Sequence, residues 1–162
     1  MSFSGTNKKN IKLLVMDVDG TLTDGHIYMG ANGELMKAFD IKDGYAIVTL
    51  DKIGVTPVII TGRSSEIVAA RAKDLKIKEC YQGVSDKLSV LKEVAAKYGA
   101  SAEEIAYIGD DVNDLDCIGY CGLSACPADA VKEVRQAVKY VCKANGGRGA
   151  VRELVDEVIK DT

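Results

Sequence analysis

The sequence predicts an α/β protein in which a doubly wound, Rossmann-like parallel sheet is covered by helices on both faces, giving three layers. Three observations support this prediction. Short apolar runs recur along the chain, helical patterns with capping residues lie between them, and 162 residues suffice for one domain with a sizeable core. Strands that alternate with helices favour a parallel sheet with right-handed crossovers.

The expected strands are continuous apolar runs, which are typical of strands buried on both faces. The first run, KLLVM, covers residues 12–16, and its two charged successors are Asp17 and Asp19. The later runs are TPVII (56–60), the shorter and weaker ECY (79–81), IAYIG (105–109), GLSAC (122–126) and YVC (140–142).

Helices are expected where a capping residue precedes an amphipathic pattern. The expected caps are Asp43 for a helix reaching about Ile53 before Gly54, Ser64 or Ser65 for residues 67–75, Ser85 or Asp86 for residues 87–98, and Ser101 with Glu104 for a single turn. Two further amphipathic helices are expected within residues 128–138 and 150–160.

One segment, at about residues 25–40, interrupts the alternation of strands and helices. It reads as a β-hairpin whose four-residue turn is Gly30 to Gly33. Its apolar side chains could pack against copies of the same chain, or the hairpin could fold onto its own domain. Residues 1–162 are therefore expected to form a single domain with this hairpin as an insertion and with no separate cap domain.

Composition excludes several classes of partner. The net charge is −3 and there is no basic run, so a nucleic-acid partner is not expected. No apolar run approaches the roughly 20 residues that span a bilayer, and the N-terminal segment MSFSGTNKKN is polar, so a cytoplasmic location is expected.

The five cysteines form no CxxC motif. Cys117 and Cys121 could hold a metal, but buried thiols in a reducing compartment are the favoured interpretation.

Reactive residues follow several of the expected strands. Asp17 and Asp19 follow the first, Thr61, Gly62 and Arg63 follow the second, Lys87 begins a helix after the weak strand, and Asp110, Asp111 and Asp114 follow the strand at 105–109. The carboxyl ends of parallel strands meet at one edge of a sheet, so we expect these side chains to converge there.

Clustered carboxylates repel one another unless a cation lies among them, and hard oxygen ligands suit Mg²⁺. One carboxylate could attack phosphorus, and a second could move the protons of a two-step transfer to water. The alternative is that each residue is structural: Asp-Gly is a common turn, and Asp110 or Asp111 could simply cap a helix.

The motifs DVDGTLTDG, ITGR, the isolated Lys87 and IGDDVND resemble, in order, the four motifs of the haloacid dehalogenase-like phosphatases. The resemblance spans about residues 12–114. It implies that Asp17 is the nucleophile and a Mg²⁺ ligand, and that Asp19 is the general acid/base and offers its backbone carbonyl to the metal. It also implies that Thr61 and Gly62 bind phosphate, that Lys87 orients phosphate and nucleophile, and that Asp110 binds the metal directly, while Asp111 and Asp114 support the metal site without binding the ion.

Longer segments resemble one family more closely. DGHIYMGANGELMKAFDIKDGYAI, ITGRSSEIVAARAKDL, YQGVSDKL and NGGRGAVRE are similar to the 3-deoxy-D-manno-octulosonate 8-phosphate phosphatases. This resemblance implies a tetramer, formed here through the hairpin, that releases phosphate from an eight-carbon keto-acid sugar on the route to lipopolysaccharide. Arg63 is a suitable partner for the sugar carboxylate, and Lys42, Asp43 and Arg148 are further candidate substrate contacts.

Two other functions stay open. A sister branch of the family acts on nine-carbon sialic-type acid 9-phosphates, and Arg63, where that branch has an acidic residue, favours the eight-carbon substrate. The chain could instead be a non-catalytic regulatory or scaffolding protein that assembles through the hairpin, although the intact Asp17, Asp19, Lys87 and Asp110 argue against it.

Overall fold

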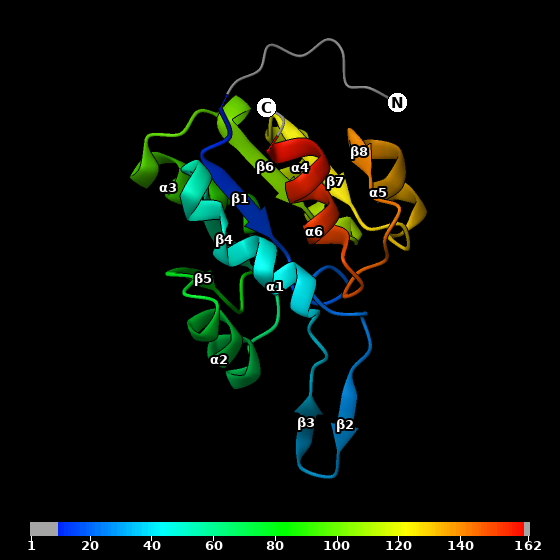
Figure 1. Cartoon of the computed structure of the whole chain (residues 1–162). Helices are drawn as coiled ribbons and strands as arrows, with labels where there is room; N and C mark the ends of the chain where they lie inside the picture. Colours follow the sequence, from blue (N-terminus) through cyan, green and yellow to red (C-terminus); the bar gives the residue numbers. More distant parts are fainter. Residues whose placement is uncertain (1–9, 161–162) are drawn as a thin grey trace.

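The computed structural model describes residues 10–160, in which six strands form one parallel sheet between two layers of helices (Figure 1). The strands are β1 (Leu13–Met16), β4 (Thr56–Ile60), β5 (Glu79–Tyr81), β6 (Ile105–Ile108), β7 (Leu123–Cys126) and β8 (Tyr140–Val141). Their order across the sheet is β5-β4-β1-β6-β7-β8, and every neighbouring pair is parallel. The predicted fold class is confirmed. The polar segment at residues 1–9 lies outside the described residues.

Alternation along the strands divides the core between the two faces of the sheet. The helices are α1 (Ile41–Val48), α2 (Glu66–Asp74), α3 (Lys87–Tyr98), α4 (Leu115–Tyr120), α5 (Lys132–Ala137) and α6 (Ala150–Leu154), which continues as a π-helical turn over Val155–Ile159. Leu14 and Met16 of β1 pack in a cluster with residues of α1, α2 and α6, while Leu13 and Val15 pack in a second cluster with residues of α3, α4 and α5. Period-two alternation therefore buries both faces of β1, as its unbroken apolar run predicts.

The residues that cap α2 and α3 are among those predicted from the sequence, but the residue that caps α1 is not. Ser65 caps α2 and Asp86 caps α3, each by accepting a hydrogen bond from a backbone N–H in the first turn. The prediction that Asp43 caps the first long helix is wrong, because Asp40 accepts from the backbone N–H groups of Lys42 and Asp43. This helix also ends earlier than expected: α1 gives way to a 3₁₀ turn, Leu50–Ile53, before Gly54.

Asp43, displaced into the first turn of α1, joins two helices that are far apart in the sequence. Its side chain is 1% exposed, and its Oδ1 accepts a hydrogen bond of 2.9 Å from the backbone N–H of Arg152 in α6. Its Oδ2 has no hydrogen-bond partner within residues 10–160. Asp43 thus occupies the N-terminal turn of α6, where free N–H groups and the helix dipole favour a carboxylate.

The predicted hairpin consists of β2 (Tyr28–Gly30) and β3 (Gly33–Met36), and it projects from the rest of the molecule (Figure 1). Gly30 pairs with Gly33, as the four-residue turn requires. Met29 and Leu35 are 63% and 67% exposed, so apolar surface of the hairpin is not buried by its own domain.

Two further findings concern the sequence expectations about membranes and cysteines. Within residues 10–160, no helix combines the length and the apolar character needed to cross a membrane. All five cysteines are free thiols, and all but Cys80 are buried.

A pH-dependent contribution to stability is expected from Asp43. Burial raises the pKa of this carboxyl group from 3.8 to about 6, against the opposing effect of the Arg152 N–H. An acid with a higher pKa in the folded state favours folding when protonated, so its contribution is lost as the pH rises from about 4 to about 6. In Asp43→Asn the free energy of unfolding, relative to wild type, should therefore rise by up to about 3 kcal/mol over this range.

Urea unfolding of both proteins at several pH values measures this difference, with the exposed Asp51→Asn as a matched control. Parallel pH profiles for wild type and Asp43→Asn would contradict the assignment.

Candidate active site

The candidate site lies where the sheet changes its direction of winding. From β1 the chain builds outward to β4 and β5, and it then crosses to β6, β7 and β8 on the other side of β1. Asp17 directly follows β1, and Asp110 follows β6 after one glycine. The gap between the carboxyl ends of β1 and β6 is the place where open α/β sheets bind ligands.

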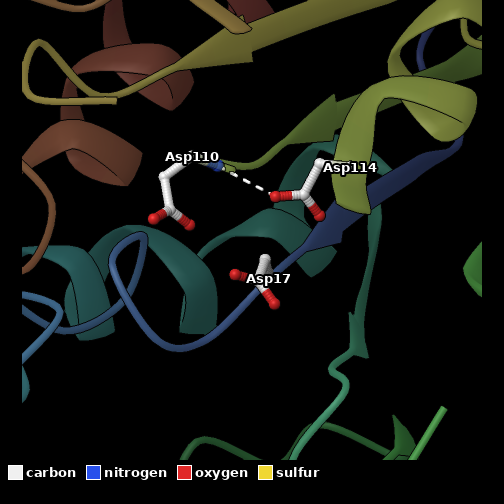
Figure 2. A group of neighbouring side chains, drawn as sticks. All are labelled: Asp17, Asp110 and Asp114. Carbon is white, nitrogen blue, oxygen red and sulfur yellow. Dashed lines mark hydrogen bonds between the residues drawn. The ribbon is translucent and has the colours of Figure 1, made fainter. Parts of the chain in front are cut away.

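Three carboxylates meet at this point (Figure 2). One oxygen from each of Asp17, Asp110 and Asp114 lies within 4.8 Å of the other two. Burial and the nearby Asp114 raise the pKa of Asp17, and burial together with Asp17 raises the pKa of Asp110 to about 8. Without a cation, the charged forms of these carboxylates are disfavoured by desolvation and mutual repulsion.

Asp114 differs from the other two because protein groups occupy both of its oxygens. Its Oδ1 accepts from Lys87 Nζ at 2.9 Å and from Tyr107 Oη at 2.5 Å. Its Oδ2 accepts from the backbone N–H groups of Asp110 at 3.0 Å (Figure 2) and Asp111 at 3.2 Å. These contacts tie Asp114 to Lys87, Tyr107 and the backbone after β6, which is consistent with the prediction that it supports the metal site without binding the ion. Tyr107 was missed, because in the sequence it is only one more apolar residue of a strand.

Lys87 connects the carboxylates to the start of α3. Its ammonium group is buried and donates to Asp17 Oδ1 at 2.8 Å as well as to Asp114. Burial by itself would lower the pKa of Lys87, but the adjacent Asp17 and Asp114 carboxylates outweigh it and raise the pKa. Lys87 therefore stays charged and leaves Asp17 partly neutralised and fixed in orientation.

The loop after Asp17 passes so close to Asp110 that only glycine fits there. Gly20 has φ +89°, and a Cβ on it would lie 2.0 Å from Asp110 Oδ2. The next residue, Thr21, donates from Oγ1 to Asp110 Oδ1 at 3.1 Å. The Gly-Thr pair that follows the two aspartates is thus explained by the need to bring Asp110 against this loop.

The tail of the chain packs against the same loop. Gly147 donates its N–H to the carbonyl of Thr21 at 3.1 Å, and a Cβ on Gly146 would lie 1.9 Å from the carbonyl oxygen of Gly20. The exposed Arg148 follows directly. The Gly-Gly pair thus permits a backbone-to-backbone contact that positions Arg148 beside the loop.

Asp19 lies at the rim, where charged residues of the hairpin reach it. Lys37 Nζ donates to Asp19 Oδ1 at 2.5 Å, and Arg63 Nε lies 3.9 Å from Asp19 Oδ2. Glu34 pairs with both Lys37 and Arg63. Lys37 and Glu34 were missed by the sequence analysis; the signal available was the presence of two charged residues within an otherwise apolar hairpin.

The remaining predicted site residues are placed as follows. Thr61 is buried directly after β4, and Gly62 and Arg63 beside it are exposed. Lys42 is exposed on the first turn of α1, whereas the carboxylate of Asp43 is buried against α6, so the geometry gives Asp43 a structural role and its contact with a substrate stays a prediction. Asp111 is exposed and caps the turn Val112–Asp114.

The donor set fits a hard divalent cation. Every candidate ligand is an oxygen, the acids lie close enough to share an ion, and their raised pKa values indicate charge that the protein alone does not balance. Asp17 and Asp110 could bind the ion through carboxylate oxygens, with the backbone carbonyl of Asp19 as a further candidate ligand. Next to that position, Asp17 is held by Lys87 in the way that a nucleophilic carboxylate needs.

Comparison with known proteins gives a consistent family. The model of the haloacid dehalogenase-like hydrolases matches residues 79–154. A 3-deoxy-D-manno-octulosonate 8-phosphate phosphatase of Yersinia pestis is 45% identical over 150 residues, which cover 93% of this chain and 80% of the relative.

Solved structures agree with this. The phosphatase of the same name from Moraxella catarrhalis, crystallised with a magnesium ion, a phosphate ion and a KDO molecule, superposes with a TM-score of 0.88 at 40% identity, covering 93% of this chain and 86% of that one. The cobalt-bound form of the Haemophilus influenzae phosphatase gives a TM-score of 0.90 at 40% identity, covering 93% and 88%. The chain therefore belongs to the haloacid dehalogenase-like hydrolases, in the family of the 3-deoxy-D-manno-octulosonate 8-phosphate phosphatases.

Proposed function

We propose that this protein is a Mg²⁺-dependent phosphatase that hydrolyses 3-deoxy-D-manno-octulosonate 8-phosphate to the free sugar acid and phosphate. One observation carries the proposal: Asp17 and Asp110 present oxygens that can share an ion, while Lys87 holds Asp17 at 2.8 Å. The Moraxella catarrhalis relative, with its magnesium, phosphate and KDO, supports both the metal and the product.

In the first step, a carboxylate oxygen of Asp17 attacks phosphorus and forms an aspartyl-phosphate, and the bond from phosphorus to the sugar oxygen breaks. The sugar oxygen takes the proton of the Asp19 carboxyl group. Asp17 reaches the phosphate with its orientation fixed, because Lys87 donates to it. Lys87 is itself held by Asp114, which also accepts a hydrogen bond from Tyr107.

In the second step, Asp19, now a carboxylate, takes a proton from water while the water oxygen attacks phosphorus. The bond from phosphorus to Asp17 breaks and inorganic phosphate is released, which restores Asp17 as a carboxylate and Asp19 as an acid. A bound Mg²⁺ supplies positive charge that lets the acids and the phosphate approach one another.

Cations and free amides at the rim supply the rest of the proposed recognition. Thr61, Gly62 and Lys87 bind the phosphate, and Arg63 pairs with the sugar carboxylate. Arg63 is 49% exposed on its side chain and its partner Glu34 can be displaced by a substrate carboxylate. Lys42 and Arg148 are further proposed substrate contacts at exposed positions, and Asp43 is a proposed contact on the first turn of α1.

We also propose that the protein is a homotetramer assembled through the hairpin and that it works in the cytoplasm. Exposed apolar side chains extend from the hairpin to α1, where Ile41 is 84% and Tyr45 58% exposed. Exposed apolar side chains on successive segments of the chain are typical of an interface between subunits. Five free thiols are consistent with a reducing compartment.

Phosphate release tests the proposed reaction. The eight-carbon 8-phosphate should give a kcat/KM at least about tenfold above that of a nine-carbon sialic-type 9-phosphate, because Arg63 favours the smaller sugar acid. Chelation should abolish the activity and added Mg²⁺ restore it, and Asp17→Asn should lose at least about 1,000-fold. A higher kcat/KM for the nine-carbon substrate would contradict the proposed substrate, and full activity after chelation would contradict the proposed dependence on Mg²⁺. Hydrolysis of no phosphate ester would favour the scaffold alternative.

Sedimentation tests the proposed assembly. Wild type should sediment as a tetramer, and the double variant Met29→Glu, Leu35→Glu should form smaller species, because four new charges per pair of hairpins cannot be buried without partners. Ile53→Glu, at an apolar position 43% exposed beside the opposite end of the sheet, is the matched control. A wild-type monomer, or a double variant that assembles normally, would contradict the proposal.

A further inference from the structure

A buried ammonium group lies between the hairpin and the proposed acid. The side chain of Lys37 is 1% exposed, although it directly follows β3, whose last two residues are exposed. Its Nζ donates to Asp19 Oδ1 at 2.5 Å and lies 3.1 Å from Glu34 Oε2. Burying an ammonium group is costly unless it is paired, and here two carboxylates share it.

The hydrogen bonds of Glu34 anchor this pair to the rest of the rim. Glu34 Oε1 accepts from Ser65 Oγ at 2.9 Å, and Glu34 Oε2 accepts from Arg63 Nη2 at 3.2 Å. Ser65 is the N-cap of α2, so it is itself fixed. A connected path of hydrogen bonds therefore runs from α2 through Glu34 and Lys37 to Asp19.

Lys37 occupies one of the two Asp19 oxygens and leaves the other available. Within residues 10–160, Asp19 Oδ2 accepts no hydrogen bond, and the half-exposed Arg63, whose Nε lies 3.9 Å from Oδ2, is too far for a direct one. Oδ1 is thus tied to the protein while Oδ2 can face the reacting phosphate. A general acid must present one oxygen at hydrogen-bond distance from the leaving oxygen, and small errors in that placement lower the reaction rate strongly.

We propose that Lys37, held by Glu34, is a positioning residue that orients Asp19 for proton transfer to the leaving oxygen. This inference rests on the proposed phosphatase reaction. In the first step the proton passes from Asp19 to the leaving oxygen while Lys37 keeps all of its own protons. The carboxylate that remains on Asp19 is then stabilised by the charge of the adjacent ammonium group until it deprotonates water in the second step.

A dependence on the leaving group separates this role from a purely structural one. An aryl phosphate with a very acidic phenol leaves without help, whereas a poor leaving group needs the proton from Asp19. In Lys37→Met, kcat/KM for the aryl phosphate with the best leaving group should fall by no more than about threefold. For unsubstituted phenyl phosphate, the fall in kcat/KM should be at least about ten times as large. The value of kcat/KM reports the first phosphoryl transfer, so slow hydrolysis of the intermediate does not mask the effect.

The experiment uses the full chain with Mg²⁺, a series of substituted phenyl phosphates and, alongside them, the octulosonate 8-phosphate. Lys37→Arg, which keeps a donor and a positive charge, should recover part of the loss on poor leaving groups. Lys52→Met, at an exposed lysine on the 3₁₀ turn after α1, is the matched control and should resemble wild type. Sedimentation and thermal unfolding of each variant report whether the assembly and the fold are kept.

Equal losses across the whole series, or no loss at all, would overturn the positioning role. Equal losses would show a structural effect, and a defect confined to the sugar acid would show that Lys37 binds substrate. Failure of the proposed function gives a different pattern: wild type would reject the octulosonate phosphate and still hydrolyse the phenyl phosphates, on which the role of Lys37 is measured independently.

Discussion

The structure depends on one constraint, the crowding of three carboxylates at the carboxyl ends of β1 and β6. Asp17, Asp110 and Asp114 lie within 4.8 Å of one another in a largely buried position. Asp114 accepts hydrogen bonds from Lys87, Tyr107 and two backbone N–H groups, and the charge of Lys87 balances its own. Asp17 and Asp110 are not fully balanced, and their raised pKa values express that deficit. A divalent cation removes it, and the same charge then attracts the phosphate of a substrate.

Segments distant in the sequence converge on the loop that follows Asp17. Glycines at 146 and 147 bring the tail against the backbone of Gly20 and Thr21, and Asp43 ties the following helix α6 to α1. The segment that follows the hairpin contacts the same loop through the hydrogen bond from Lys37 to Asp19. The exposed apolar patch proposed for assembly begins on this hairpin, so contacts between subunits and the orientation of Asp19 share one short segment of chain.

Much of this arrangement could be predicted from the sequence, for physical reasons. Strands buried on both faces are unbroken apolar runs, and β4 and β5 cover the residues expected. Parallel strands bring their carboxyl ends to one edge, which predicted that Asp17 and Asp110 meet. Local capping chemistry narrowed two caps to pairs of neighbouring residues, Ser64 or Ser65 and Ser85 or Asp86, of which the structure has Ser65 and Asp86.

The remainder depends on contacts between residues distant in the chain. Asp43 was predicted to cap α1, but the N-terminal turn of α6, more than 100 residues later, draws its side chain inward, and Asp40 caps α1 instead. Tyr107 cannot be distinguished from a core residue without knowing that Asp114 folds back beneath it. Lys37 and Glu34 become significant only when the hairpin places them beside Asp19 and Arg63. Short helix α4, with Gly119 in its interior, has too weak a pattern to be recognised.

The most direct test of this account is a crystal structure of the protein with Mg²⁺, with Mn²⁺ substituted in a second crystal so that its anomalous scattering identifies the ion. We expect one ion between Asp17 and Asp110, with a carboxylate oxygen of each at about 2.1 Å and with Asp114 still bonded to Lys87 and Tyr107. An ion bound elsewhere, or Asp17 and Asp110 too far apart to bind the same ion, would contradict the central claim.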